Sequence, residues 1–144
     1  MSMDWTLEVV VLPVSDIARS IAFYRDQVGF HLDHDTTNEW MHVVQLTPRG
    51  SGCSIVFGDM PGQNEMAPGS MRALHLVVSD AAAGRAELVS RGVECSEQMS
   101  FGDEDGGTFF GFSDPDGNTW AVQELTVRAE KPLIPLDARG RFGE

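Results

Sequence analysis

Apolar residues in the first half of the chain switch from strand-like to helix-like spacing. Residues 7–12 form a short apolar run rich in β-branched side chains, which favours a strand. The apolar positions after this run recur at spacings of four, three and four, as expected for one face of a helix: Ile17, Ile21, Tyr24 and Val28. Gly29 follows directly, and glycine is the residue that most often ends a helix. Three short strand candidates complete this half, at residues 30–35, 40–47 and 53–58.

The second half repeats this order of elements. The segment at 12–16, Leu-Pro-Val-Ser-Asp, recurs 64 residues later as Leu-Val-Val-Ser-Asp. A strand-like run precedes the second copy, and a weaker helical stripe follows it, with Gly92 at its end. In each copy the Ser-Asp pair is suited to cap the N-terminus of the helix. Three further strand candidates follow at 93–98, 108–113 and 119–126, so a β-α-β-β-β unit is used twice.

Turn and linker signals divide the chain around this repeat. Glycine- and proline-containing turns precede the last strand of each unit, at 48–52 and 114–118. We therefore expect one domain over residues 1–144, divided as follows. The first module spans 5–58, the linker 59–70, the second module 71–127 and a C-terminal tail 128–144.

Composition narrows the classes of function. Twenty-two acidic residues against ten basic ones give a net charge of −12, which repels phosphate backbones and argues against nucleic-acid binding. No apolar run approaches the roughly 20 residues that cross a bilayer, and the N-terminus lacks the features of a signal peptide. Cys53 and Cys95 have no metal-type spacing and are expected to be buried thiols. These features predict a cytoplasmic protein without a membrane partner.

Two motifs carry a resemblance to a known family. The stretch 14–30 contains the sequence FYRDQVGF, and the stretch 112–120 contains DPDGN. In this order, with a repeat between them, they resemble the vicinal oxygen chelate superfamily, which includes glyoxalase I, bleomycin-resistance proteins and extradiol dioxygenases. The resemblance covers about residues 5–127. It implies an α+β fold of two βαβββ modules, whose curved mixed sheet cups a small-molecule cavity with the helices outside, and it implies a homodimer.

The superfamily's usual metal ligands are absent from the matching positions. Metal-using members place ligands on the first and last strands of each half, and the corresponding residues here are Val9, Val56, Ala73 and Ala121. Divalent cations need nitrogen, oxygen or thiolate donors at about 2.0–2.6 Å, which these side chains lack. We therefore predict no metal and no other cofactor, and an apolar cavity floor.

His75 is the leading candidate for a polar group in the cavity. Alternate residues of a strand share a face, so His75 is expected to point with Ala73, and Gln123 with Ala121. His75 could act as an acid–base group or as a hydrogen-bond donor to a ligand, or it could be a structural histidine within the sheet. The predicted lining residues are Val9, Val11, Trp40, His42, Gln45, Val56, Ala73, His75, Phe110, Ala121 and Gln123.

Three functions remain open at this point. The first is a small-molecule-binding protein, or a metal-independent enzyme using His75, for a hydrophobic or aromatic metabolite. The second is a lyase, isomerase or dioxygenase of the glyoxalase type that uses a divalent metal at a displaced site including His75. The third is a protein whose main role is association. His31 and His34 are not expected to form a metal site, because on a regular strand they point to opposite faces.

Overall fold

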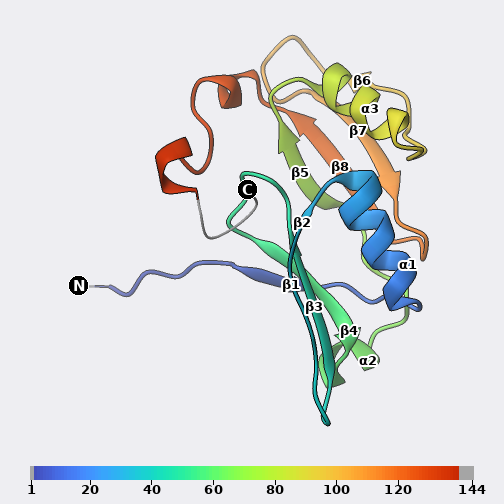
Figure 1. The fold of residues 1–144 in the computed structure, drawn as a ribbon. Coiled ribbons are helices and arrows are strands. Elements are labelled where there is room, and N and C mark those ends of the chain that lie inside the picture. The colour runs from blue at the N-terminus through green and yellow to red at the C-terminus, as the bar shows by residue number, and fades with distance from the viewer. Residues whose placement is uncertain (1, 140–144) are drawn as a thin grey trace.

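Two four-stranded mixed sheets form the body of the protein (Figure 1). The computed structural model describes residues 2–139; the last part of the predicted tail, 140–144, lies outside the described residues. The strands of the first sheet are β1 (Val9–Val11), β2 (His31–Thr37), β3 (His42–Thr47) and β4 (Ser54–Asp59). Those of the second are β5 (Leu74–Val78), β6 (Met99–Ser100), β7 (Thr108–Ser113) and β8 (Thr119–Glu124).

The two sheets have the same topology. Their strand orders are β1-β4-β3-β2 and β5-β8-β7-β6. In each sheet the first strand pairs in parallel with the fourth, and the other pairs are antiparallel. The matching topology of the two sheets confirms the predicted α+β fold of two βαβββ modules.

Each module carries its helix where the sequence places it. In the first, α1 (Ile17–Ile21) continues into the π-helical segment η1 (Ala22–Val28). In the second, α3 spans Ala81–Ser90. Asp16 and Asp80, rather than the preceding serines, cap the two helices by accepting hydrogen bonds from backbone N–H groups at 3.0 Å. Gly29 ends η1 with φ of 94°, in the left-handed region that favours glycine.

The linker and the tail contain short helical segments. They are α2 (Pro61–Asn64), η2 (Thr126–Ala129) and η3 (Leu136–Ala138). The predicted strand at 93–98 is largely absent: Cys95 makes one isolated bridge, to Phe112, and β6 begins only at Met99. Arg85 explains this difference, because its guanidinium donates hydrogen bonds to the backbone carbonyl oxygens of residues 95 and 96, which a neighbouring strand would otherwise use.

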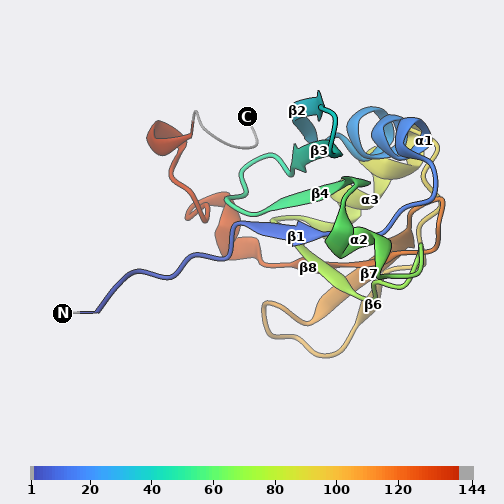
Figure 2. The ribbon, with the colours of Figure 1, turned by 90° about the horizontal axis from the view of Figure 1, so that it is seen from below.

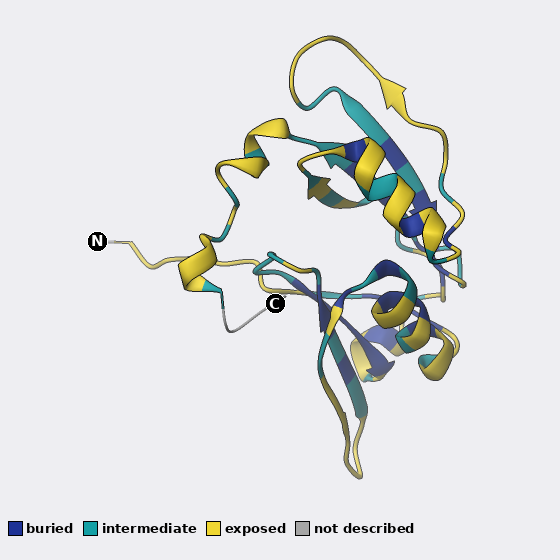
Figure 3. Cartoon of the chain, turned by 45° about the horizontal axis from the view of Figure 1, so that its top comes forward, coloured by how far each residue is buried: buried dark blue, intermediate teal, exposed yellow. Residues whose placement is uncertain are grey.

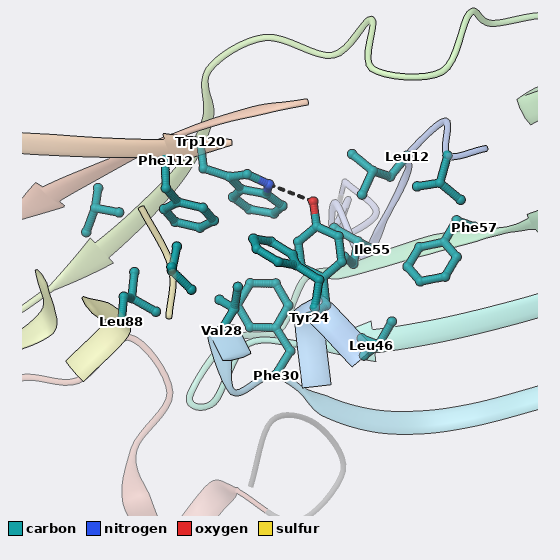
Figure 4. Close-up of a cluster of buried hydrophobic side chains, with 14 of the residues drawn as sticks. Leu12, Tyr24, Val28, Phe30, Leu46, Ile55, Phe57, Leu88, Phe112 and Trp120 are labelled. Atoms are coloured by element: carbon teal, nitrogen blue, oxygen red, sulfur yellow. Dashed lines mark hydrogen bonds between the residues drawn. The ribbon is translucent and has the colours of Figure 1, made fainter. Parts of the chain in front are cut away.

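A single core joins the two modules (Figure 4). Both helices pack on one face of the sheets and leave their outer sides exposed to solvent, as Figure 3 shows by burial. The largest fully buried side chains include Tyr24, Phe57, Leu12 and Leu46. Phe112 stacks on Trp120 at 6.0 Å between ring centroids, and Tyr24 meets the same indole edge-on at 5.8 Å.

The two motifs that carry the family resemblance meet in this core. The Tyr24 hydroxyl donates to Asp114 Oδ2 at 2.8 Å and accepts from Trp120 Nε1 at 2.9 Å. Asn118 donates its side-chain amide both to Asp114 Oδ2, at 2.8 Å, and to the Pro13 carbonyl, at 2.9 Å. Burial, reinforced by the nearby Asp114 carboxylate, raises the pKa of Tyr24 and keeps the phenol protonated. We call these four residues, Tyr24, Asp114, Asn118 and Trp120, the module joint.

A β-bulge changes the orientation predicted for two histidines. His31 pairs with Thr47 and His34 pairs with Gln45, with the register shifting between Leu32 and His34. Thr47 and Gln45 are two residues apart on β3, so both histidines face the same side and the prediction of opposite faces is wrong. Within residues 2–139 there is still no group of three or more His, Cys, Asp or Glu side chains arranged for a metal ion.

Two further features bear on cellular context. In the part of the chain that the structure describes, no helix is both long and apolar enough to cross a bilayer. Cys53 and Cys95 are free, half-buried thiols, and burial raises the pKa of both.

Candidate ligand-binding site

The helix-free face of the second sheet carries a paired histidine and glutamine. On β5, Leu74, Leu76 and Val78 pack against the core, whereas His75 and Val77 between them are exposed. Trp120 and Val122 are buried in the core, so Ala121 and Gln123 also face away from the helices. His75 Nε2 lies 3.0 Å from Gln123 Oε1. The predicted alternation therefore brings His75, Ala121 and Gln123 to one face.

The loop beside Gln123 determines which residue of this pair donates the hydrogen bond. Gln123 Nε2 donates to the Gly106 carbonyl at 2.8 Å, which turns the amide oxygen toward His75. That oxygen can only accept, so a neutral His75 carries its proton on Nε2 and donates it. The other ring nitrogen, Nδ1, makes no hydrogen bond within residues 2–139. A ligand hydroxyl or N–H group could therefore donate to it.

Two aromatic rings extend the face beyond His75. The imidazole meets Phe109 edge-on at 6.0 Å between centroids, and Phe109 meets Phe101 at 6.0 Å. Phe101 is 72% exposed on the segment that leads from β6 toward β7. Asp105 holds the far end of that segment by accepting the Thr126 N–H at 2.7 Å. The result is an aromatic strip with a hydrogen-bonding imidazole at one end.

The helix-free face of the first sheet is apolar at one end and polar at the other. Val11 pairs with Val56, and Val56 lies between the core residues Ile55 and Phe57, so it faces away from the core. Val9, two residues before Val11, is 45% exposed on the same face. All three valines present hydrocarbon on this side of the sheet, where Val56 itself is buried at 7% exposed.

Gln45 belongs to the polar end of this face. It pairs with Val56 and donates to Ser54 Oγ at 3.3 Å. Ser54 and Thr47 are buried, and their hydroxyls lie 2.6 Å apart. Thr47 also donates to Asp33, so this network satisfies its own polar groups.

Four predicted lining residues lie elsewhere. Trp40 is 79% exposed at the tip of the β2–β3 hairpin, beyond either sheet face. His42 alternates with Gln45 and so lies on the opposite face of β3, where it pairs with Asp35 at 2.6 Å. Ala73 precedes β5 in a left-handed conformation, with φ of 56°, and donates its N–H to Thr119.

Phe110 is the fourth, and it points into the core. It is 2% exposed and pairs with Val122, whereas Phe109 takes the helix-free side of β7. Phe110 also lines a cleft of about 470 Å³ between the modules, together with Val28, Phe30 and Leu88.

The donor set does not fit the metal that the superfamily's usual site would hold. Val9, Val56, Ala73 and Ala121 offer only hydrocarbon, and none supplies a lone pair to a cation. His75 has Gln123 as a polar neighbour, and within residues 2–139 it belongs to no group of three or more His, Cys, Asp or Glu side chains that could hold a metal ion.

Sequence reasoning missed the aromatic strip. The run Thr-Phe-Phe-Gly-Phe at 108–112 signals a strand, but its register decides which ring lies on the helix-free face, and no residue in the run fixes that register. Phe101 lies in an acidic, glycine-rich segment without periodicity, so the sequence carried no signal for it.

Comparison with known proteins places this arrangement in a family. Residues 6–122 match the sequence profile of the Glyoxalase/Bleomycin resistance protein/Dioxygenase superfamily. No match was found among curated proteins. The crystal structure of TnmS3, an antibiotic binding protein from Streptomyces sp. CB03234, is 32% identical, with a TM-score of 0.73 over 87% of this chain and 98% of that one.

Two other solved structures show the same fold. A glyoxalase/bleomycin resistance protein from the same strain is 33% identical, with a TM-score of 0.70 over 83% of this chain and all of its own. A superfamily member from Sphaerobacter thermophilus, at 24% identity and a TM-score of 0.71, covers 85% of this chain and 99% of its own and supports the fold alone. The chain therefore belongs to the Glyoxalase/Bleomycin resistance protein/Dioxygenase superfamily.

Proposed function

We propose that this protein binds a hydrophobic or aromatic small molecule on the helix-free face of its second sheet, without a metal ion. The observation that carries the proposal is the His75–Gln123 pair, fixed at 3.0 Å beside the half-buried Phe109 and the exposed Phe101. Aromatic side chains provide apolar area, and a few oriented polar groups provide specificity. The similarity to TnmS3, described as an antibiotic binding protein, supports binding over catalysis.

The roles of the residues follow from their chemistry. Phe109 and Phe101 contact a flat apolar surface of the ligand, and Ala121 leaves room for it against the sheet. His75 Nδ1 accepts a hydrogen bond from the ligand, while Gln123 holds the ring in orientation. On the first sheet, Val9, Val11 and Val56 supply a second apolar wall and Gln45 a polar group.

We also propose that two copies of the chain associate in the cytoplasm. Apolar side chains remain exposed on the helix-free faces, including Val77 at 41% and Met99 at 53%. Residues 2–8 extend away from the sheets, as Figures 1 and 2 both show, and expose Trp5 and Leu7. Patches of this kind mark contact sites for other molecules. Free thiols are consistent with a reducing compartment.

Association predicts a dimer in solution. Light scattering coupled to size-exclusion chromatography should give twice the mass of one chain. Replacing Trp5 and Leu7 by serine should shift the mass toward one chain, because the replacement removes apolar area from the interface. A monomeric wild-type protein at micromolar concentration would contradict the proposed dimer, although not the ligand site.

Ligand binding is tested by a thermal-shift screen of hydrophobic metabolites, with and without divalent metal. A ligand that binds only the folded state raises the melting temperature. For a compound found in this way, His75→Ala should weaken binding by about 5- to 100-fold, as expected for one lost hydrogen bond and lost aromatic contact.

His42→Ala is the control, since His42 lies on the opposite face of β3, where it pairs with Asp35 at 2.6 Å. It should leave the affinity unchanged. Equal affinity of His75→Ala and wild type would remove His75 from the site. Stoichiometric Ni, Zn, Fe or Mn that survives purification would overturn the metal-free proposal.

A further inference from the structure

A groove beside the aromatic strip is free of acidic side chains. It has a volume of about 440 Å³ and lies between the β3–β4 turn, strand β5 and the C-terminal segment. Its lining residues are Pro48, Arg49, Gly50, Ser51, His75, Leu76, Val77, Val78, Ser79, Arg128, Pro132, Leu133 and Arg139. In a chain with 22 acidic and ten basic residues, this lining holds three arginines and one histidine, but no aspartate or glutamate.

The three arginines have no carboxylate partner within residues 2–139. Arg128 donates to the Lys131 carbonyl at 3.5 Å, and Arg139 to the Ile134 carbonyl at 3.2 Å. Elsewhere, four other arginines form ion pairs with carboxylates: Arg19, Arg25, Arg85 and Arg91. Backbone carbonyls orient a guanidinium without neutralising it, so the groove keeps a concentrated positive charge.

Two glycines let the C-terminal segment close one side of the groove. A Cβ atom at Gly50 would lie 3.2 Å from Arg139 Nη2, and one at Gly52 would lie 3.2 Å from Ile134 Cδ1. The backbone of the turn therefore packs directly against both side chains. This contact holds the Arg139 guanidinium against the β3–β4 turn, whose Arg49 lines the same groove.

The geometry points to an organic anion as the ligand: a carboxylate, sulfonate or phenolate on an apolar body. Arg49, Arg128 and Arg139 would bind the anionic group, because guanidinium groups recognise oxyanions with paired hydrogen bonds. Val77, Leu133 and the aromatic strip would contact the apolar body. This inference rests on the proposed function, since His75 belongs both to the groove and to the ligand face.

A matched pair of fluorescent probes tests the charge requirement. 8-Anilinonaphthalene-1-sulfonate and N-phenyl-1-naphthylamine share one aromatic skeleton, but only the first carries a negative charge. Both become brighter in an apolar site, so titration gives a dissociation constant for each. We expect the sulfonate to bind at least about ten times more tightly, corresponding to about 1.4 kcal/mol. Raising the salt concentration should reduce this difference.

Arginine variants assign the preference to the groove. Arg49→Gln and Arg128→Gln should each weaken the sulfonate by about 5- to 20-fold and leave the neutral probe within about two-fold. Arg49 is exposed and makes no side-chain hydrogen bond in the described part of the chain, so its replacement should not disturb folding. Arg25→Gln makes the same change in net charge at an arginine paired with Asp26, and it should have no effect.

The outcomes separate this inference from the proposed function. If the two probes bind equally, or if the arginine variants bind the sulfonate like wild type, the anion preference is wrong while the binding site stands. If neither probe binds the folded protein at one site per chain, the proposed function itself fails.

Discussion

Asp114→Ala is expected to lower the free energy of unfolding by about 3–5 kcal/mol, because it removes the central acceptor of the module joint. Asp114 is 5% exposed and accepts four hydrogen bonds at 2.8–2.9 Å. The donors are the Tyr24 hydroxyl, the Asn118 side-chain amide and the backbone N–H groups of Asp116 and Asn118. After the substitution the buried Tyr24 hydroxyl and the buried Asn118 backbone N–H have lost their acceptor, and the Asn118 side-chain amide keeps only its bond to the Pro13 carbonyl. Urea unfolding monitored by circular dichroism measures the change.

Asp26→Ala is the matched control for this substitution. It also removes a carboxylate, but from an exposed pair with Arg25, so the urea midpoint should change little. A similar midpoint for both variants would show that the module joint contributes no more than a surface ion pair.

The module joint explains why the family motifs indicate the fold more clearly than the reaction. Tyr24 comes from the first motif, and the other three residues come from the second. All four are buried. Their hydrogen bonds connect a helix of one module to the last turn and strand of the other. A motif that packs in the core says little about the ligand, which we propose to bind on the opposite face of the sheet.

The sequence correctly predicted two kinds of local feature: the positions of the helix caps and the side chains that share a face on a regular strand. Asp16 and Asp80 cap the helices at the expected positions, and on regular strands His75 and Gln123 share a face, as alternation requires. The same reasoning failed where the register depends on tertiary contacts. The bulge in β2 turned His31 and His34 to one side, which no local pattern signals.

The sequence also did not fix the register of β3 and β7, so some predicted lining residues of these strands lie on the wrong face. Gln45 reaches the helix-free face, whereas His42, an odd number of residues away, does not. Phe109 and Phe110 differ by one position, and that position decides between the helix-free face and the core.

The arginine groove could not be predicted for a different reason. Arg49, Arg128 and Arg139 lie in a turn and in a tail without hydrophobic periodicity, up to 90 residues apart in sequence. Their convergence requires the tail to fold back onto the turn at Gly50 and Gly52, a contact between irregular segments. Hydrophobic patterns predict single helices and strands, whereas this groove brings together arginines from separate irregular segments.

The linker provides a second large effect on stability: Gly69→Ala is expected to lower the free energy of unfolding by at least about 3 kcal/mol. Gly69 has φ of 79°, and a Cβ atom there would lie 2.0 Å from the Asp116 carbonyl oxygen. The linker backbone is also tied in place, since the Gly69 N–H donates to the Pro13 carbonyl at 3.2 Å. The added methyl group must therefore push the linker away from the turn that carries Asp114 and Asn118.

Gly117→Ala separates this clash from backbone strain. Gly117 lies in the same turn with φ of 98°, but a Cβ atom there would meet no atom within 4 Å. Its substitution should cost only the strain of a left-handed alanine, about 1 kcal/mol. Urea unfolding of both variants gives the comparison, and equal losses would mean that the linker moves freely against the turn. A larger loss for Gly69→Ala would show that the linker, as well as the helices, holds the two modules in register.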